Sequence, residues 1–235
     1  MKYIKQFDAV RAIAVILVII YHWFPKKYYA NLPLGSVGVD IFFVLSGFLI
    51  TRILILKKVN LEESLKSKSK IRAIFEFMTR RALRIFPIYY LLLLVLCIVS
   101  VFFPNPIPTH WGYYVLYLQN FIFYFNQSFQ GGKVAHLWSL AVEEQFYIIW
   151  PIVIFFINKK YIKHVLIFGI VIGTISSIFF PLIPSKPELS PVLTICCLQS
   201  FCLGGLLSYW SIQNEERLKN NYTYIKYTGL LSLFI

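Results

Sequence analysis

The stretch FDAVRAIAVILVIIYHWF, residues 7–24, places two ionisable groups near the ends of an apolar run. Arg11 and His22 are eleven positions apart, which in an α-helix is three turns plus about 20°, so both side chains share one face. The helical rise separates them by roughly 16 Å, about half the hydrocarbon core of a bilayer. Asp8 falls near the same stripe. This face either lines a protein interior or wet cavity, or it lets Arg11 and His22 reach the membrane interface.

The whole chain has the composition of an integral membrane protein. Of its 235 residues, 58% are hydrophobic and 14% are charged, and apolar runs long enough to cross a lipid bilayer recur, which excludes the soluble classes. We expect an all-α, polytopic transmembrane helix bundle that forms one domain over residues 1–235. It has about seven spans: residues 8–24, 37–56, 85–103, 138–157, 164–183 and 192–212, and an incomplete run from 227. That last run is too short to cross, so it predicts further C-terminal helices or an oligomeric partner.

The distribution of lysine and arginine predicts how the bundle is oriented. If the aromatic segment 113–125 does not cross and the N-terminus is cytoplasmic, 19 of the 23 basic residues lie inside, whereas 15 do if it crosses. The positive-inside rule therefore favours a re-entrant or interfacial 113–125. It also makes residues 57–84 a basic cytoplasmic loop, so the net charge of +13 indicates membrane topology and not a nucleic-acid partner.

The second apolar run, GSVGVDIFFVLSGFLIT at residues 35–51, brings a carboxylate to the level of His22. Asp40 lies about one turn into a helix that descends from the same surface. A carboxylate beside an imidazole fixes its tautomer and raises its basicity, as a general base requires. A buried polar pair that stabilises helix packing is an equally good alternative. Ser46 and Gly47, deeper in this helix, could be small packing residues.

The fourth span opens with HLWSLAVEEQFYIIWP, residues 136–151. Ser139, Glu143 and Tyr147 are spaced by four residues and form one polar stripe on an otherwise apolar helix. An intramembrane glutamate indicates function by default, with His22 or Arg11 as candidate partners. Because the same feature would serve proton transport, Glu143 alone does not identify an enzyme.

The basic segment before the third span ends in MTRRALRIFPIYY, residues 78–90. Arg81 and Arg84 are neighbours on one helical face. A pair of guanidiniums at a membrane mouth could hold phosphate groups through bidentate contacts. Alternatively, these charges only keep the segment in the cytoplasm and contact anionic lipid.

Taken together, these pieces resemble the integral-membrane acyltransferase family 3, whose members O-acylate bacterial surface sugars and related molecules. Four motifs carry the resemblance, in the family's order and over most of residues 7–151: Arg11-x10-His22, GVDIFFVLSGFLIT, Arg81-x-x-Arg84 and WSLAVEEQFY. Any one of these motifs would be weak, but all four in order are highly specific. The resemblance implies a multi-pass enzyme of the bacterial inner membrane.

The resemblance implies roles for residues of the first and fourth spans. His22 matches the histidine that removes the proton of the acceptor hydroxyl, and Arg11 matches its partner in the first helix. The residues that match the family's fourth-span motif near the reaction centre are Trp138, Ser139, Glu143 and Tyr147. Trp138, Ser139 and Tyr147 are expected to bind the acceptor, which is a sugar or glycan.

On the cytoplasmic side, the resemblance implies an acyl-CoA donor, with acetyl-CoA the expected form. Arg81 and Arg84 match an arginine pair associated with this donor. Ser46 and Gly47 match the part of the second helix that borders the donor channel. Such a channel would let the donor's thioester reach His22 from the other side of the membrane.

The leading hypothesis is an O-acyltransferase that moves an acetyl group from cytoplasmic acetyl-CoA to a hydroxyl of an extracytoplasmic sugar or glycan. His22 would act as general base, oriented by Asp40 or Glu143, while Arg11 stabilises developing negative charge. The competing hypothesis is a transporter of sugar-lipid or organic anions that uses the same Arg–His–Glu path without covalent chemistry. The four cysteines lie inside apolar runs without metal or redox spacing, so we expect core residues and no metal.

Overall fold

The computed structural model describes residues 5–25, 27, 32–63, 70–102, 110–129, 132–183 and 189–214. These residues form helices and turns, and none of them forms a strand. Within these described ranges, six helices are long and apolar enough to cross a membrane: α1 (Lys5–Trp23), α2 (Leu34–Glu63), α3 (Lys70–Phe102), α6 (Trp138–Phe156), α7 (Ile162–Phe179) and α8 (Thr194–Gln213). The expected all-α bundle is confirmed, whereas the seventh run, from residue 227, lies outside the described residues.

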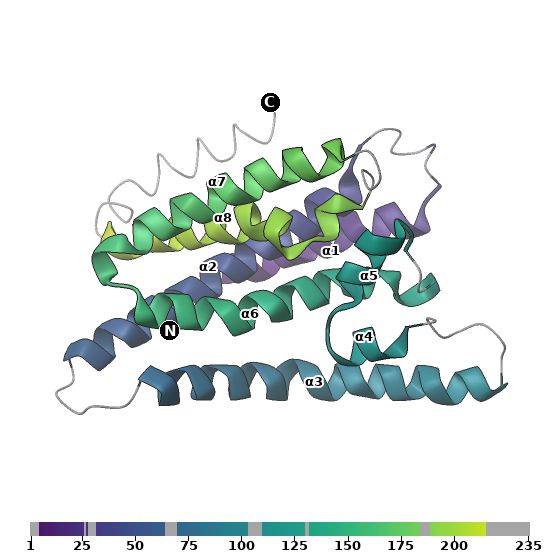
Figure 1. Cartoon of the computed structure of the whole chain (residues 1–235), viewed down its shortest axis with the longest axis horizontal. Helices are drawn as coiled ribbons and strands as arrows, with labels where there is room; N and C mark the ends of the chain where they lie inside the picture. The colour runs from purple at the N-terminus through teal and green to yellow at the C-terminus, as the bar shows by residue number, and fades with distance from the viewer. Residues whose placement is uncertain are drawn as a thin grey trace.

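The six helices lie side by side with alternating direction (Figure 1). Helix α2 packs against α1, α6 and α8, with α7 on the outside of α8 and α3 beside α6. A core of stacked rings joins α2, α6 and α8: Phe201 lies 4.7 Å from Phe43 and 4.2 Å from Phe146, between ring centroids. These contacts make α2 the central helix of the bundle.

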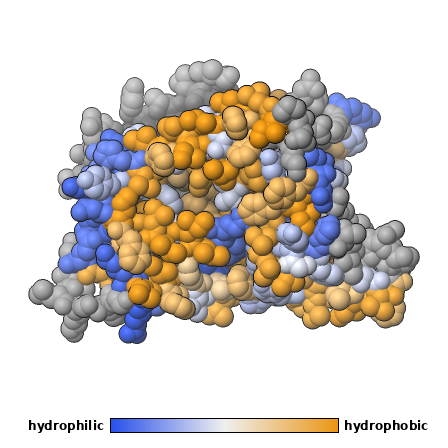
Figure 2. All heavy atoms as spheres, viewed as in Figure 1, coloured by the Kyte–Doolittle hydropathy of each residue, from blue (hydrophilic) through white to orange (hydrophobic). Residues whose placement is uncertain are grey.

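On the face seen in Figure 2, hydrophobic residues cover most of the middle and hydrophilic residues gather toward the two ends. Helix α3 exposes further apolar side chains, among them Leu83, Ile88 and Leu91. A broad apolar belt with polar ends is what a lipid bilayer requires of a helical protein. Three of the four cysteines are buried as expected, but Cys97 is exposed on α3 because that helix meets the bundle along one side only.

The segment expected as a basic loop, residues 57–84, is mostly helical. Helix α2 continues to Glu63 and α3 already begins at Lys70, so each helix extends beyond its apolar part. Glu76 offsets part of the positive charge, because its carboxylate forms ion pairs with Lys57 at 2.8 Å and with Arg72 at 3.3 Å. Charged residues with strong helix propensity thus lengthen the two helices instead of forming a loop.

The segment 113–125 does not cross the bundle. It forms two short helices, α4 (Trp111–Val115) and α5 (Gln119–Asn126), separated at Tyr117 by a left-handed φ of 55°. Two amide side chains hold it in place: the buried Gln119 donates from Nε2 to the Leu137 carbonyl at 2.8 Å, and the half-buried Gln145 donates from Nε2 to the Tyr117 carbonyl at 2.8 Å. Burial raises the pKa of Tyr114 to about 12, so this phenol stays neutral.

Two glycines allow α2 and α8 to approach closely. A Cβ atom on Gly47 would overlap the carbonyl oxygen of Phe201, and one on Gly204 would overlap the carbonyl oxygen of Val44. Helices in membranes pack by such small-residue contacts. The structure therefore supports the packing interpretation of Gly47, and the expected donor contact of this residue stays a prediction.

A buried lysine fastens the end of α2 to the end of α6. Lys58 is 2% exposed, and its Nζ donates to the Ile154 carbonyl at 2.9 Å and to the Ile157 carbonyl. Ile154 lies in the last turn of α6 and Ile157 is its C-cap residue, so no helical N–H is left to bind these carbonyls. The positive charge also faces the negative end of the helix dipole.

We expect Lys58→Met to lower the free energy of unfolding by about 2 kcal/mol, since it leaves buried carbonyls without a charged donor. Thermal unfolding of the detergent-solubilised protein should show a melting temperature lower by about 4–8 °C. Lys163→Met is the control, because Lys163 is exposed at the start of α7. Equal melting temperatures for the two variants would contradict this capping role.

Candidate functional site

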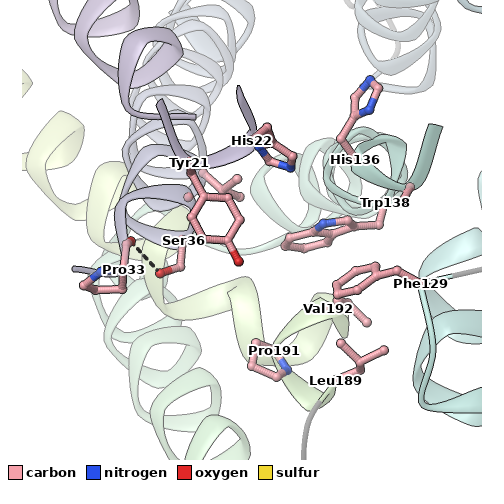
Figure 3. A pocket seen from close by; sticks show the side chains of 13 residues that line it. Tyr21, His22, Pro33, Ser36, Phe129, His136, Trp138, Leu189, Pro191 and Val192 are labelled. Carbon is pink, nitrogen blue, oxygen red and sulfur yellow. Dashed lines mark hydrogen bonds between the residues drawn. The ribbon is translucent and has the colours of Figure 1, made fainter. Parts of the chain in front are cut away.

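The cavity at the His22 end of the bundle has a volume of about 490 Å³. It lies where α1 ends and where α2, α6 and α8 begin, and Figure 3 shows the side chains of Tyr21, His22 and Trp138 gathered around it. Phe129 and His136, from the segment between α5 and α6, also line it. The size is that of a small-molecule site.

Within this cavity, His22 has a defined tautomer. Its Nδ1 lies 2.8 Å from the carbonyl oxygen of Val18, one turn earlier in α1. A carbonyl oxygen only accepts hydrogen bonds, so Nδ1 carries the proton of the neutral ring. Nε2 is then the nitrogen with a free lone pair, as a general base needs.

Asp40, expected beside His22, and Arg11, expected at the opposite end of α1, each have another partner. Asp40 accepts a hydrogen bond from Ser200 Oγ at 2.8 Å and so joins α2 to α8. Arg11 pairs with Asp8 on its own helix, with Nη1 to Oδ1 at 3.1 Å. In the structure, the group that orients the His22 ring is therefore the Val18 carbonyl. The sequence had predicted Asp40 or Glu143 for this role.

Glu143 is held by two hydroxyl groups. Ser46 Oγ from α2 donates to Oε1 at 3.0 Å, and Tyr147 OH from the next turn of α6 donates to Oε2 at 2.8 Å. Tyr147 OH also lies 3.2 Å from Ser46 Oγ, which closes a triangle of polar groups. Glu143 and Tyr147 thus lie on one face of α6, as predicted for the polar stripe. The third residue of the stripe, Ser139, donates to the His136 carbonyl at 3.1 Å instead.

This polar triangle continues toward α3 through one arginine. The Arg81 guanidinium lies over the Tyr147 ring, 5.3 Å from its centroid, and over the Phe77 ring at 5.7 Å. Such cation–π contacts fix an arginine without neutralising it. Arg81 is half-buried, whereas Arg84, one turn later on the same helix α3, is exposed.

A second, smaller cavity lies between the His22 cavity and the polar triangle of Ser46, Glu143 and Tyr147. Its volume is about 120 Å³, and its walls are Val39, Phe42, Phe43, Ser139, Leu140 and Glu143. Val39 lines both cavities, and Ser139 directly follows Trp138 of the larger one. The His22 cavity, the small cavity and the contacts of Tyr147 with Glu143 and Arg81 therefore follow one another along α6.

Two contacts of the site were missed by sequence reasoning. The Val18 carbonyl could have been found, because it lies four residues before His22 in the same helix. The contact between Ser46 and Glu143 could not, because 97 residues separate them and only the packing of α2 on α6 brings them together.

Comparison with known proteins places the chain among acyltransferases. The family described as "Acyltransferase domain" matches residues 4–235. The "Peptidoglycan O-acetyltransferase OatA" of Listeria monocytogenes is 40% identical over 182 residues, which are 73% of this chain and 27% of that protein. The "O-acetyltransferase OatA" of Staphylococcus aureus is 34% identical over 174 residues, 68% of this chain and 26% of that protein. The aligned region is about a quarter of the length of these relatives, and no solved structure matches the chain.

Proposed function

This chain belongs to the acyltransferase-domain family, and from that premise we propose that it moves an acyl group, with acetyl the expected one, from cytoplasmic acyl-CoA to a hydroxyl of an extracytoplasmic cell-wall glycan. The positive-inside rule supports this direction, since it puts the N-terminus in the cytoplasm and His22 near the outer face. The names of the relatives support acetyl as the group and a cell-wall glycan as the acceptor.

The observation that carries the proposal is the contact of His22 Nδ1 with the Val18 carbonyl at the larger cavity, which leaves Nε2 as the basic nitrogen. The acceptor hydroxyl gives its proton to Nε2, and its oxygen forms a bond to the acyl carbon. The bond from that carbon to the CoA sulfur breaks, and the sulfur takes the proton from the imidazolium. The products are an ester and free CoA thiol, and His22 regains its neutral form with the proton on Nδ1.

The larger cavity is suited to a glycan acceptor. Tyr21, Phe129 and Trp138 bring aromatic rings with flat apolar faces against which the C–H face of a sugar packs. Ser36 and His136 add polar groups at the rim for sugar hydroxyls. Trp138 therefore keeps the acceptor-binding role that the sequence implied, while Ser139 and Tyr147 lie deeper along α6.

The donor side of the proposal uses the polar groups that lead away from His22. Ser46, Glu143 and Tyr147 line the route of the donor's pantetheine arm, and Arg81 meets its phosphates at the cytoplasmic mouth. Arg11 lies roughly 16 Å from His22 along α1, which is too far to contact the reacting carbon. In this proposal it therefore interacts with the negative charge of the donor, as Arg81 does.

The decisive experiment follows labelled acetyl from acetyl-CoA into a peptidoglycan fragment in membrane vesicles that contain the protein. We expect a labelled ester and a matching release of CoA thiol, both dependent on the acceptor. Transport of an unmodified sugar-lipid or organic anion without release of CoA would overturn the proposal in favour of a transporter.

Arg81→Gln should raise the KM for acyl-CoA by about 10- to 100-fold with little change in kcat, because a charge-assisted phosphate contact contributes to binding of ground and transition state alike. Initial rates over a range of donor concentrations measure this. Arg80→Gln is the matched control, since the side chain of Arg80 is 76% exposed and pairs with Glu76. If both variants raised KM equally, Arg81 would act only through the overall charge of the segment.

A further inference from the structure

The smaller cavity has no role in the reaction as described so far. We propose that it holds the acyl group of the donor and restricts that group to short chains of about two to four carbons. The inference rests on the acyltransferase function proposed above and adds to it the class of acyl group that this chain accepts.

The position of the smaller cavity is the first argument. Val39 belongs to the walls of both cavities, so the acyl site adjoins the space proposed for the acceptor. Glu143 forms the opposite part of the wall and begins the polar route toward Arg81. An acyl carbon in transfer must lie between its donor and its acceptor, and the smaller cavity is at that place.

The volume is the second argument. An apolar cavity of about 150 Å³ holds benzene, which has six carbon atoms. By proportion, about 120 Å³ holds roughly five non-hydrogen atoms, which equals one carbonyl oxygen and four carbons. An acetyl group therefore fits with space to spare, whereas a hexanoyl or octanoyl group would extend beyond the cavity walls.

The chemistry and rigidity of the walls are the third argument. Four of the six lining residues are apolar, as a methyl or methylene group requires. Phe43 is 1% exposed and stacks on Phe201 at 4.7 Å, so this wall is fixed by the core. Phe42 is half-buried, so its ring can be removed from the cavity wall without opening the core.

The test measures donor choice, using the full chain in membrane vesicles with acetyl-CoA and hexanoyl-CoA. The wild-type protein is expected to prefer acetyl-CoA. Phe42→Ala should raise the ratio of hexanoyl to acetyl kcat/KM by about 10- to 200-fold, the effect of added methylenes in a hydrophobic pocket. Phe156→Ala is the control, since Phe156 is 61% exposed at the far end of α6 and should leave the ratio unchanged.

A narrowing variant gives an independent answer should Phe42→Ala fail to fold. Leu140→Phe reduces the cavity and should lower transfer from butanoyl-CoA more than transfer from acetyl-CoA. Acetyl transfer with an unchanged donor ratio in the enlarging and narrowing variants would overturn this inference and leave the proposed function intact. No acyl transfer by the wild-type protein from any CoA thioester would instead overturn the proposed function itself.

Discussion

Acyl transfer should fall by about 10²- to 10⁴-fold in His22→Ala, the usual contribution of a general base. The loss should appear in kcat, because the acceptor cavity keeps its aromatic walls while the group that accepts the proton is gone. Rates of CoA release with saturating acetyl-CoA and a peptidoglycan fragment measure this effect.

Two further variants separate base chemistry from packing. His22→Gln retains a polar side chain of similar size but offers no basic nitrogen, so it should be as inactive as His22→Ala. His164→Gln removes an exposed histidine from α7 and should keep the full rate. Normal transfer by His22→Gln would show that the ring serves the fold and not proton transfer.

The second large effect concerns the crossing of α2 and α8. Gly47→Val should prevent correct assembly, because its side chain would occupy the space of the Phe201 backbone. Overpacking a core typically costs about 1–3 kcal/mol, and a collision with a main-chain carbonyl leaves no flexible neighbour to move, so we expect the top of this range or more. Size-exclusion profiles and thermal unfolding in detergent should show a large loss of folded protein.

Gly112→Ala is the matched control for Gly47→Val. A Cβ on Gly112 meets no atom within 4 Å, and alanine has the higher helix propensity in α4. This variant should therefore fold at least as well as the wild-type protein. Should Gly47→Val fold equally well and lose only donor binding, Gly47 would belong to the donor channel that the family resemblance implied.

Local sequence patterns predicted the spans well. The apolar runs at 8–24, 138–157 and 192–212 correspond to α1, α6 and α8 within a few residues, because hydrocarbon thickness sets the length of a span directly. The same reasoning failed beyond the apolar part of α2 and α3. There the charged turns remain helical up to Glu63 and from Lys70, since helix propensity and pairing with Glu76 do not depend on burial.

The candidate site was predicted less completely, and its contacts show why. Positions on one helix follow from its period, so Glu143 and Tyr147 were correctly placed on one stripe. Depth in the membrane also follows from residue counting, but it says nothing about rotation around a helix axis. Asp40 was therefore placed at the level of His22, while the structure turns its carboxylate toward Ser200 on α8.

By itself, the sequence determined that this chain is a helical membrane protein with Arg11 and His22 on one face of α1, because bilayer thickness and helical period act on local residues. Only the tertiary structure decided which side chains meet: Ser46 with Glu143, Arg81 with Tyr147, and His22 with the cavity beside Trp138. These contacts depend on how close helices approach and how they rotate against one another. Small residues such as Gly47 and Gly204 set that approach, across more than 150 residues of chain.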